Sequence, residues 1–258
     1  GDDVFSTLNA LKKLGVKIIK DKEKWKVFGN GLGLISRFHK TLDLGNSGTG
    51  VRLLMGLVAG SNVRATFIGD DSLNQRPMKR IIEPLINTGA QIQSENNFLP
   101  ITIQGSKIPI PIQYKSNLAS AQVKSCVLLS GLTSTGNTSY YEPLLSRDHT
   151  ERMLNYMGAE IISKKIPEVG WKITLKGLPI LKNCHFKIPN DPSSAAFPIV
   201  AALLTPNSKI TLKNICVNNL RTGLFTTLIE MGGKIKIYNK RKVCGEEIAD
   251  ITAETSSL

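Results

Sequence analysis

The sequence lacks the features that mark membrane proteins, disulfide-bonded proteins and zinc-binding modules. No apolar run approaches the roughly 18 residues that a transmembrane helix needs, which argues against a membrane protein. The four cysteines, Cys126, Cys184, Cys216 and Cys244, are far apart and include no Cys-x-x-Cys pair. This spacing argues against both zinc and a disulfide framework, and it is typical of proteins from a reducing compartment. We therefore expect a cytoplasmic protein.

Aromatic residues make up only 6% of the chain, and no run of basic residues reaches five, although the net charge is +13. A basic protein can bind nucleic acid or anionic metabolites. Because the lysines are scattered and aromatic stacking platforms are scarce, we favour a solvated, lysine-rich surface over nucleic-acid binding. The first residues, Gly-Asp-Asp-Val, contain neither a start Met nor a signal pattern.

A pattern of helix, glycine and β-branched strand recurs every 69 to 74 residues. The glycines at this junction are Gly15, Gly89, Gly158 and Gly232. A fixed period of this length indicates one supersecondary unit copied along the chain. Residues 1–31 supply only the second half of a first repeat, so we expect the chain to be a fragment that opens inside a repeat.

Each complete repeat also contains a helix that is apolar nearly all round, which indicates a helix inside a domain. These helices are expected over Ser47–Gly60, Leu118–Leu132 and Asp191–Leu204. The strands of the second repeat are expected at Thr41–Leu44, Val63–Ile68, Ala90–Ser94 and Leu99–Ile103. The resulting order, βαβαββ, predicts a fold of the α/β (α+β) class. A second, amphipathic helix in this repeat is expected to begin at Pro77 and to end at Gly89.

Polar residues gather where the apolar helices begin. The three starts contain Asn46 to Thr49, Ser116 to Gln122, and Asn190 to Ser194. Free N–H groups and the helix dipole make such ends anion sites, although plain N-capping also explains each one taken alone. Arg76 and Arg147 could complete an anion-binding face, because the guanidinium fork binds two oxygens at once, or they could be surface charges.

Other motifs fail on inspection. Gly45 to Gly50 has the glycine spacing of a P-loop, but Val51-Arg52 stands where Lys-Ser/Thr is required. His39, His149 and His185 have no ligand spacing with the cysteines. We find no nucleophile–base pair for covalent catalysis.

Five motifs in consistent order resemble the bacterial 5-enolpyruvylshikimate-3-phosphate synthases over essentially the whole chain. They are Leu44-Gly-Asn-Ser-Gly-Thr-Gly-Val-Arg52, Arg76-Pro-Met78, Ala119-Ser-Ala-Gln-Val-Lys124, Ser146-Arg-Asp-His-Thr-Glu151 and Asp191-Pro-Ser-Ser-Ala-Ala-Phe197. The resemblance implies the inside-out barrel of the enolpyruvyl transferases, built from six repeats in all, three in each of two domains. It places residues 1–178 in most of one domain and residues 179–258 in a truncated second domain.

The resemblance further implies a monomer that transfers the enolpyruvyl group of phosphoenolpyruvate to the 5-hydroxyl of shikimate 3-phosphate, in aromatic amino-acid biosynthesis. The reaction releases phosphate, and the resemblance implies that it needs neither a metal nor an organic cofactor. The residues implied to hold shikimate 3-phosphate are Ser120, Ala121, Gln122, Ser146 and Arg147. Those implied at phosphoenolpyruvate are Asn46, Gly48, Arg76 and again Gln122. Glyphosate-tolerant relatives carry Ala where this chain has Gly48, so a sensitive enzyme is implied.

The family's acid–base residues would lie outside this sequence, and Asp191 reads as a helix cap rather than as one of them. No catalytic residue is therefore assigned, and the 258 residues alone are expected to show little turnover. The alternatives are a non-catalytic ligand-binding remnant, a transferase acting on a UDP-amino sugar, and a basic nucleic-acid-binding protein. The UDP-sugar alternative needs a reactive cysteine, whereas Cys126 lies in an apolar helix.

Overall fold

The chain was analysed as a computed structural model that describes residues 1–33, 35 and 39–258. These residues form two compact units. The first compact unit comprises Gly1–Leu144 and Glu160–Ile180, and the second comprises Leu145–Ala159 and Leu181–Leu258. The expected domain boundary after residue 178 stays a prediction. Among the described residues, no helix is both long and apolar enough to cross a membrane.

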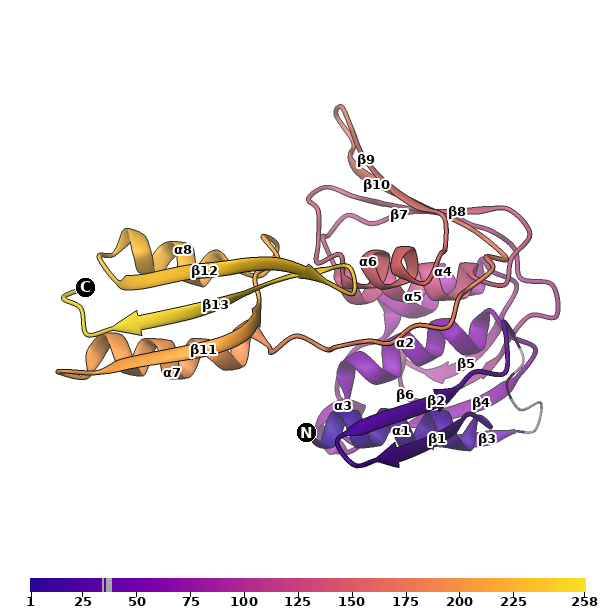
Figure 1. The fold of residues 1–258 in the computed structure, drawn as a ribbon. Coiled ribbons are helices and arrows are strands. Elements are labelled where there is room, and N and C mark those ends of the chain that lie inside the picture. Colours follow the sequence, from indigo (N-terminus) through magenta and orange to yellow (C-terminus); the bar gives the residue numbers. More distant parts are fainter. Residues whose placement is uncertain (34, 36–38) are drawn as a thin grey trace. The chain divides into compact units, whose positions relative to one another are not determined.

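The second repeat has the expected βαβαββ order, with one short additional helix (Figure 1). Its elements are β3 (Lys40–Asp43), α2 (Gly48–Ala59), β4 (Arg64–Ile68), α3 (Asp71–Asn74), α4 (Lys79–Ile86), β5 (Gln91–Glu95) and β6 (Phe98–Gln104). They form an open sheet in the order β3-β4-β6-β5. Strands β3 and β4 are parallel, as a crossover through a helix requires, and the other pairs are antiparallel.

The third repeat copies this arrangement. Its elements are β7 (Gln113–Lys115), α5 (Ala121–Gly131), β8 (Asn137–Glu142), α6 (His149–Tyr156), β9 (Ile161–Ile166) and β10 (Gly170–Lys176). The strand order β7-β8-β10-β9 is the same as in the second repeat, and β7 and β8 are again parallel. The repeat inferred from the spacing of the glycines is therefore confirmed, as is the α/β class.

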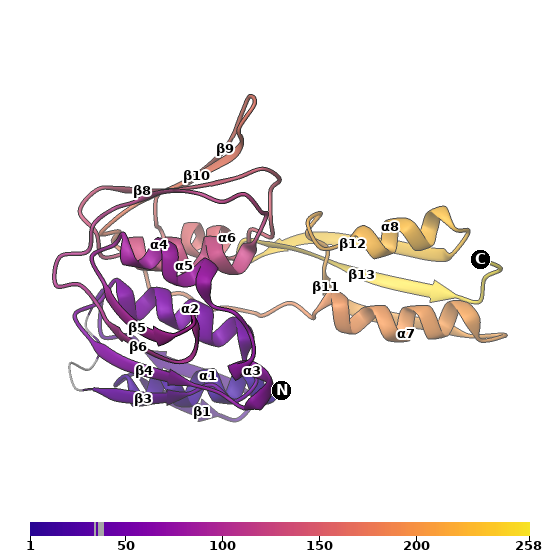
Figure 2. The ribbon, with the colours of Figure 1, turned by 180° about the vertical axis from the view of Figure 1, so that it is seen from behind.

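The first and fourth repeats are less complete. The first contributes α1 (Asp2–Lys13), β1 (Lys17–Asp21) and β2 (Lys24–Phe28). The fourth contributes α7 (Pro192–Leu204), β11 (Lys209–Cys216), α8 (Gly223–Glu230), β12 (Lys234–Val243) and β13 (Glu246–Glu254). Its sheet has the order β11-β13-β12, and the expected first strand shrinks to one parallel bridge between Asn190 and Ile215. Helices α7 and α8 share a core with one face of this sheet (Figure 2).

Two expectations about the helices were wrong. Helix α4 begins at Lys79 rather than at Pro77: Met78, with φ −110° and ψ 4°, takes the N-cap position, and its carbonyl accepts from the Ile82 N–H at 3.0 Å. Helix α7 is not buried on every side: Phe197 is 80% exposed, whereas Ile199 is fully buried. Its buried face packs on β11 and β13, and the described chain does not cover the opposite face.

Helices α2 and α5 run side by side at unusually short range (Figure 1). Gly56 of α2 faces the backbone of Cys126, and Gly60 at the end of α2 faces the backbone of Ser130. A β-carbon at Gly56 would overlap the Cys126 carbonyl group. Glycine in a helix interior costs about 1 kcal/mol relative to alanine, so this close approach explains why glycine stands there.

This packing predicts that Gly56→Ala destabilises the protein despite the better helix propensity of alanine. The added methyl group must push α2 away from α5, at a cost of about 1–3 kcal/mol in the free energy of unfolding. Urea denaturation followed by circular dichroism measures the change. Gly29→Ala is the matched control, because a β-carbon there meets nothing within 4 Å. Equal stabilities of the two variants would contradict the packing argument.

Candidate anion-binding site

Helix α2 begins in a tight turn that follows β3. Gly45 has a φ of +52°, a conformation that favours glycine, and its N–H donates to Asp43 Oδ1 at 2.9 Å. Ser47 is the N-cap, and its Oγ accepts from the Gly50 N–H at 3.2 Å. Capping satisfies one of the four N–H groups that a helix start leaves without an intrahelical partner. The capping interpretation is confirmed for Ser47, and the positive end of the helix dipole lies at the same turn.

Arg76 is held beside this turn by a chain of hydrogen bonds. Its Nη2 donates to Asn46 Oδ1 at 2.6 Å, and Asn46 Nδ2 donates to Asp70 Oδ2 at 2.8 Å. Asp70 in turn caps α3 by accepting from the Leu73 N–H at 2.8 Å. The pKa of Asp70 is lowered, first by this backbone bond and then by the bond from Asn46. The charge of Arg76 contributes less to that shift. The main contact of the Asp70 side chain on the arginine side is therefore its hydrogen bond with Asn46.

Arg52 and Arg80 bring further positive charge to the same place. Arg52 Nη1 donates to the Gly48 carbonyl at 2.9 Å, which folds its guanidinium back over the first turn of α2. Burial lowers the pKa of Arg52, and the charges of Arg80 and Arg76 lower it further. Arginine still remains protonated at neutral pH, so the three groups create a positive potential that a bound anion would relieve.

Gly48 lies between two of these guanidinium groups. A β-carbon built there would be 2.8 Å from Arg76 Nη1 and 3.0 Å from Arg52 Nη1. Both distances are shorter than ordinary van der Waals contacts, so a methyl group would displace at least one flexible side chain. Glycine at this position therefore leaves room for the arginines to close around the helix start.

The start of α5 lies next to the start of α2. Gln122 Nε2 donates to Thr49 Oγ1 at 2.8 Å, which joins the first turns of the two helices. Ser120 stands at the N-cap of α5 in extended backbone, and its hydroxyl makes no capping bond within the described chain. The structure thus brings together the predicted residues of the first compact unit, which are Asn46, Gly48, Arg76, Ser120, Ala121 and Gln122.

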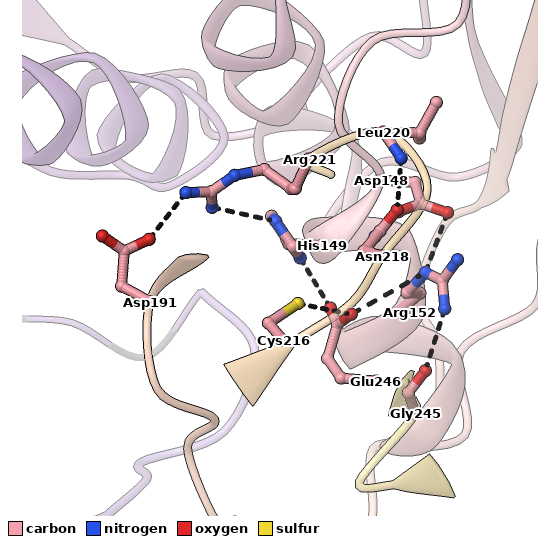
Figure 3. Close-up of polar contacts among 10 residues, drawn as sticks. All are labelled: Asp148, His149, Arg152, Asp191, Cys216, Asn218, Leu220, Arg221, Gly245 and Glu246. Carbon is pink, nitrogen blue, oxygen red and sulfur yellow. Dashed lines mark hydrogen bonds and ion pairs between the residues drawn. The ribbon is translucent and has the colours of Figure 1, made fainter. Parts of the chain in front are cut away.

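Ser146 and Arg147 belong to the second compact unit, immediately before α6. Arg147 is exposed and Ser146 is partly buried. Asp148, at the N-cap of α6, does not cap it with its side chain, because Asp148 Oδ1 accepts from Asn218 at 2.6 Å and Oδ2 from Arg152 at 2.8 Å (Figure 3). A role for Ser146 and Arg147 in binding substrate stays a prediction.

The fourth repeat carries a copy of the arginine arrangement. Arg221 Nη2 donates to Asp191 Oδ1 at 2.6 Å, and this pair has the same separation of 30 residues as Arg76 and Asn46 (Figure 3). Asp191 also caps α7 by accepting from the Ser194 N–H at 2.9 Å. Burial raises the pKa of Asp191, but the bonds from Ser194 and Arg221 outweigh it, and the net shift is downward. The predicted capping role of Asp191 is confirmed.

Sequence reasoning missed several residues of these networks. Arg52 lies four residues after Gly48. Helical spacing could therefore have predicted that its side chain reaches the first turn of α2. Asp70 had no such local signal, since it reaches Asn46 across 24 residues. His149, Cys216 and Glu246 also meet in the fold, with 97 residues separating His149 from Glu246.

The copied sheets, the closely packed helices and the arginines at paired helix starts define a repeat-built α/β protein with a candidate anion-binding site. Comparison with known proteins specifies the family. The sequence profile of EPSP synthase (3-phosphoshikimate 1-carboxyvinyltransferase) matches residues 1–258. The chain belongs to the EPSP synthase family.

Individual relatives agree with this assignment. The 3-phosphoshikimate 1-carboxyvinyltransferase of Parvibaculum lavamentivorans is 49% identical over 100% of this chain and 58% of its own length. The enzyme of the same name from Bartonella henselae is 48% identical with the same coverage. A solved structure of EPSP synthase from Acinetobacter baumannii matches with a TM-score of 0.88 at 39% identity, over 99% of this chain and 57% of that one. The chain spans about 58% of the length of the curated relatives it matches.

The hydrogen bonds of Asp70 predict a pH-dependent stability. A carboxyl whose pKa is lowered in the folded state stabilises that state above its unfolded pKa of about 4, and the contribution is lost as pH falls through the folded value. We therefore expect Asp70→Asn to reduce the loss of Tm on going from about pH 6 to pH 3. Thermal unfolding across this range measures it, and Asp71→Asn is the control for removal of a nearby charge. A parallel Tm profile for Asp70→Asn and the unmodified protein would contradict the prediction.

Proposed function

We propose that this protein acts in the transfer of the enolpyruvyl group from phosphoenolpyruvate to the 5-hydroxyl of shikimate 3-phosphate, with release of phosphate. The curated relatives carry the name of this transferase, and the chain shares nearly half of its residues with them. The observation that carries the proposal is the arginine-lined junction of the α2 and α5 starts. Each of the two substrates bears a phosphate and a carboxylate, which are the groups that arginine forks and helix starts bind best.

In this proposal, Arg76 pairs with an anionic group of phosphoenolpyruvate while Asn46 and Gly48 line the same pocket. Ser120, Ala121 and Gln122 contact shikimate 3-phosphate, and Ser146 and Arg147 complete those contacts. The reaction forms a bond between the 5-oxygen and C2 of phosphoenolpyruvate and breaks the bond from C2 to the phosphate oxygen. Negative charge shifts onto the leaving phosphate, so guanidinium groups held ready beside it would stabilise the transition state.

Proton transfer is a separate requirement. The attacking hydroxyl must lose a proton, and C3 of phosphoenolpyruvate gains and then loses one, which needs positioned acid–base groups. Asp191 is not offered for this role, because it caps α7 and pairs with Arg221. The proposed part of these residues in catalysis is binding and electrostatic stabilisation.

The UDP-amino-sugar alternative gains no support from Cys126. Its side chain is fully buried in α5, and burial strongly raises the pKa of the thiol. A reactive cysteine needs a partly exposed thiolate with a lowered pKa, so Cys126 fits a packing role.

We further propose that the protein is a monomer and that it acts in the cytoplasm.

The experiment that tests the function is an assay of the intact gene product with both substrates. We expect phosphate release that requires both shikimate 3-phosphate and phosphoenolpyruvate, with the enolpyruvyl ether detected by proton NMR. Phosphate release from phosphoenolpyruvate alone would indicate a different enzyme and would contradict the proposal.

Arg76→Gln tests the proposed anchor for phosphoenolpyruvate. Loss of a charged donor aimed at the reacting group is expected to lower kcat/KM by a factor of about 10² to 10³. The kcat/KM of Arg76→Lys should fall between those of Arg76→Gln and the unmodified protein, since lysine keeps the positive charge but lacks the two-pronged guanidinium group. The control is Arg64→Gln, an exposed arginine on β4. If Arg64→Gln and Arg76→Gln lower kcat/KM equally, the loss reflects general charge rather than a specific contact.

Gly48→Ala tests the crowding between Arg52 and Arg76. The added methyl group would narrow the space between the two guanidinium groups, and glyphosate inhibition of the intact protein is expected to weaken by at least ~10-fold, equivalent to about 1.4 kcal/mol. Inhibition curves at fixed phosphoenolpyruvate measure the effect, with Gly29→Ala as the matched glycine control. An unmodified protein that is already insensitive to glyphosate would show that Gly48 is wrongly assigned.

A further inference from the structure

Three different metal-ligating side chains converge in the second compact unit, outside the residues proposed to bind substrate. They are His149, the first residue of α6, Cys216, the last residue of β11, and Glu246, the first residue of β13. One ligand atom from each lies within 4.8 Å of the others (Figure 3). His149 Nδ1 is 2.7 Å from Glu246 Oε1, and Cys216 Sγ is 4.0 Å from Glu246 Oε2.

We propose that these three side chains form a binding site for one zinc ion, with water as the fourth ligand. A thiolate, an imidazole and a carboxylate are the ligands that Zn²⁺ accepts, whereas Mg²⁺ and Ca²⁺ prefer oxygen alone. Bond lengths of about 2.0–2.3 Å place the ligand atoms of a tetrahedral zinc site about 3.3–3.6 Å apart. The observed separations bracket that range, so side-chain movements of about 1 Å would close the site around an ion.

The position of the cluster suits a site that exchanges with solvent. All three side chains line a cavity of about 220 Å³, to which Asp191 and Arg221 also contribute. The Glu246 side chain is 13% exposed and that of His149 is 36% exposed, so water can reach the centre. Because Cys216 is buried on the inner side, an ion would be held between the buried thiol and the solvent.

The ion-paired side chains around the cluster carry one excess negative charge, although Lys187 also lines the cavity and the whole chain has a net charge of +13. Asp148, Asp191 and Glu246 carry three negative charges, and Arg152 and Arg221 carry two positive charges (Figure 3). With a neutral thiol the group therefore has one excess negative charge. Binding of Zn²⁺ with release of the thiol proton would bring the charge of these ion-paired groups and the ion to zero.

The two arginines do not block this arrangement. Arg221 Nη1 lies 3.4 Å from His149 Nε2, and since arginine only donates, the ring proton of His149 lies on Nδ1 and faces Glu246. When zinc binds at Nδ1, that single ring proton would move to Nε2, so His149 would bind the ion as a neutral imidazole. The long contact to Arg221 would then open, while Arg221 stays held by Asp191 at 2.6 Å and Ser193 at 2.8 Å.

The site would join the start of α6 to the ends of two strands of the fourth repeat. Arg152 of α6 already lies 3.9 Å from Glu246, so the same contact exists as a weak ion pair without metal. A zinc ion bound by His149, Cys216 and Glu246 would connect α6 to the two strands more strongly than this ion pair does. The proposal does not depend on the transferase activity, since none of the three ligands is among the proposed substrate-binding residues.

Cobalt titration of the full protein tests the proposal. Co²⁺ is expected to bind with a stoichiometry of one, to give a near-ultraviolet thiolate-to-cobalt charge-transfer band and the visible spectrum of a tetrahedral ion, and to be displaced by Zn²⁺. Cys216→Ser should abolish the charge-transfer band. Glu246→Gln should keep the band but weaken binding at least ~10-fold. The matched control is Cys244→Ser, which lines the same cavity and should leave the spectrum unchanged.

Native mass spectrometry of the unmodified protein provides a second readout that does not rely on any variant folding correctly. One retained zinc ion, together with a rise of Tm on adding Zn²⁺, would support the site. The proposal is overturned by the absence of a charge-transfer band in the unmodified protein, by its persistence in Cys216→Ser, or by its loss in Cys244→Ser. Retention of no zinc by the unmodified protein would overturn it equally.

Discussion

The contact between the glycines of α2 and the backbone of α5 is the constraint on which the candidate anion-binding site depends. Because Gly56 and Gly60 carry no side chain, the two helices approach until their backbones touch. Their first turns are then joined by the bond from Gln122 to Thr49. Two helix dipoles consequently add at one place, and the loops before both helices face the same small region. A larger residue at either glycine would push α2 away from α5 at that contact.

Positive charge is abundant in this chain, so charge alone does not distinguish the site. What distinguishes it is that the charges of Arg76 and Arg80 act on the partly buried Arg52, while the nearby Asp70 is engaged mainly with a backbone N–H and with Asn46. Scattered surface lysines are screened by water and salt. Partly buried guanidinium groups at a helix start are screened less, and they are the groups that an incoming phosphate or carboxylate would meet.

The repeat made most of the fold predictable, because a period of helix, glycine and strand specifies both element order and pairing. Local prediction failed at the start of α4, where Met78 takes the N-cap position, and in α7, where Phe197 is 80% exposed although the helix is apolar. The site followed the same rule. Motifs identified Asn46 and Arg76, whereas Asp70 and the cluster of His149, Cys216 and Glu246 depend on pairings that no local spacing records.

The hydrogen-bonded chain from Asp70 through Asn46 to Arg76 has a further consequence for how the protein would meet its ligand. A free arginine side chain samples many rotamers, and ordering it on binding costs about 0.5–1.5 kcal/mol. Here much of that conformational entropy is lost during folding, so the cost falls on the stability of the protein and not on association. The hydrogen-bonded chain thus lowers the stability of the folded protein slightly and raises its affinity for an anion. The Arg76 guanidinium group is already oriented before the anion binds.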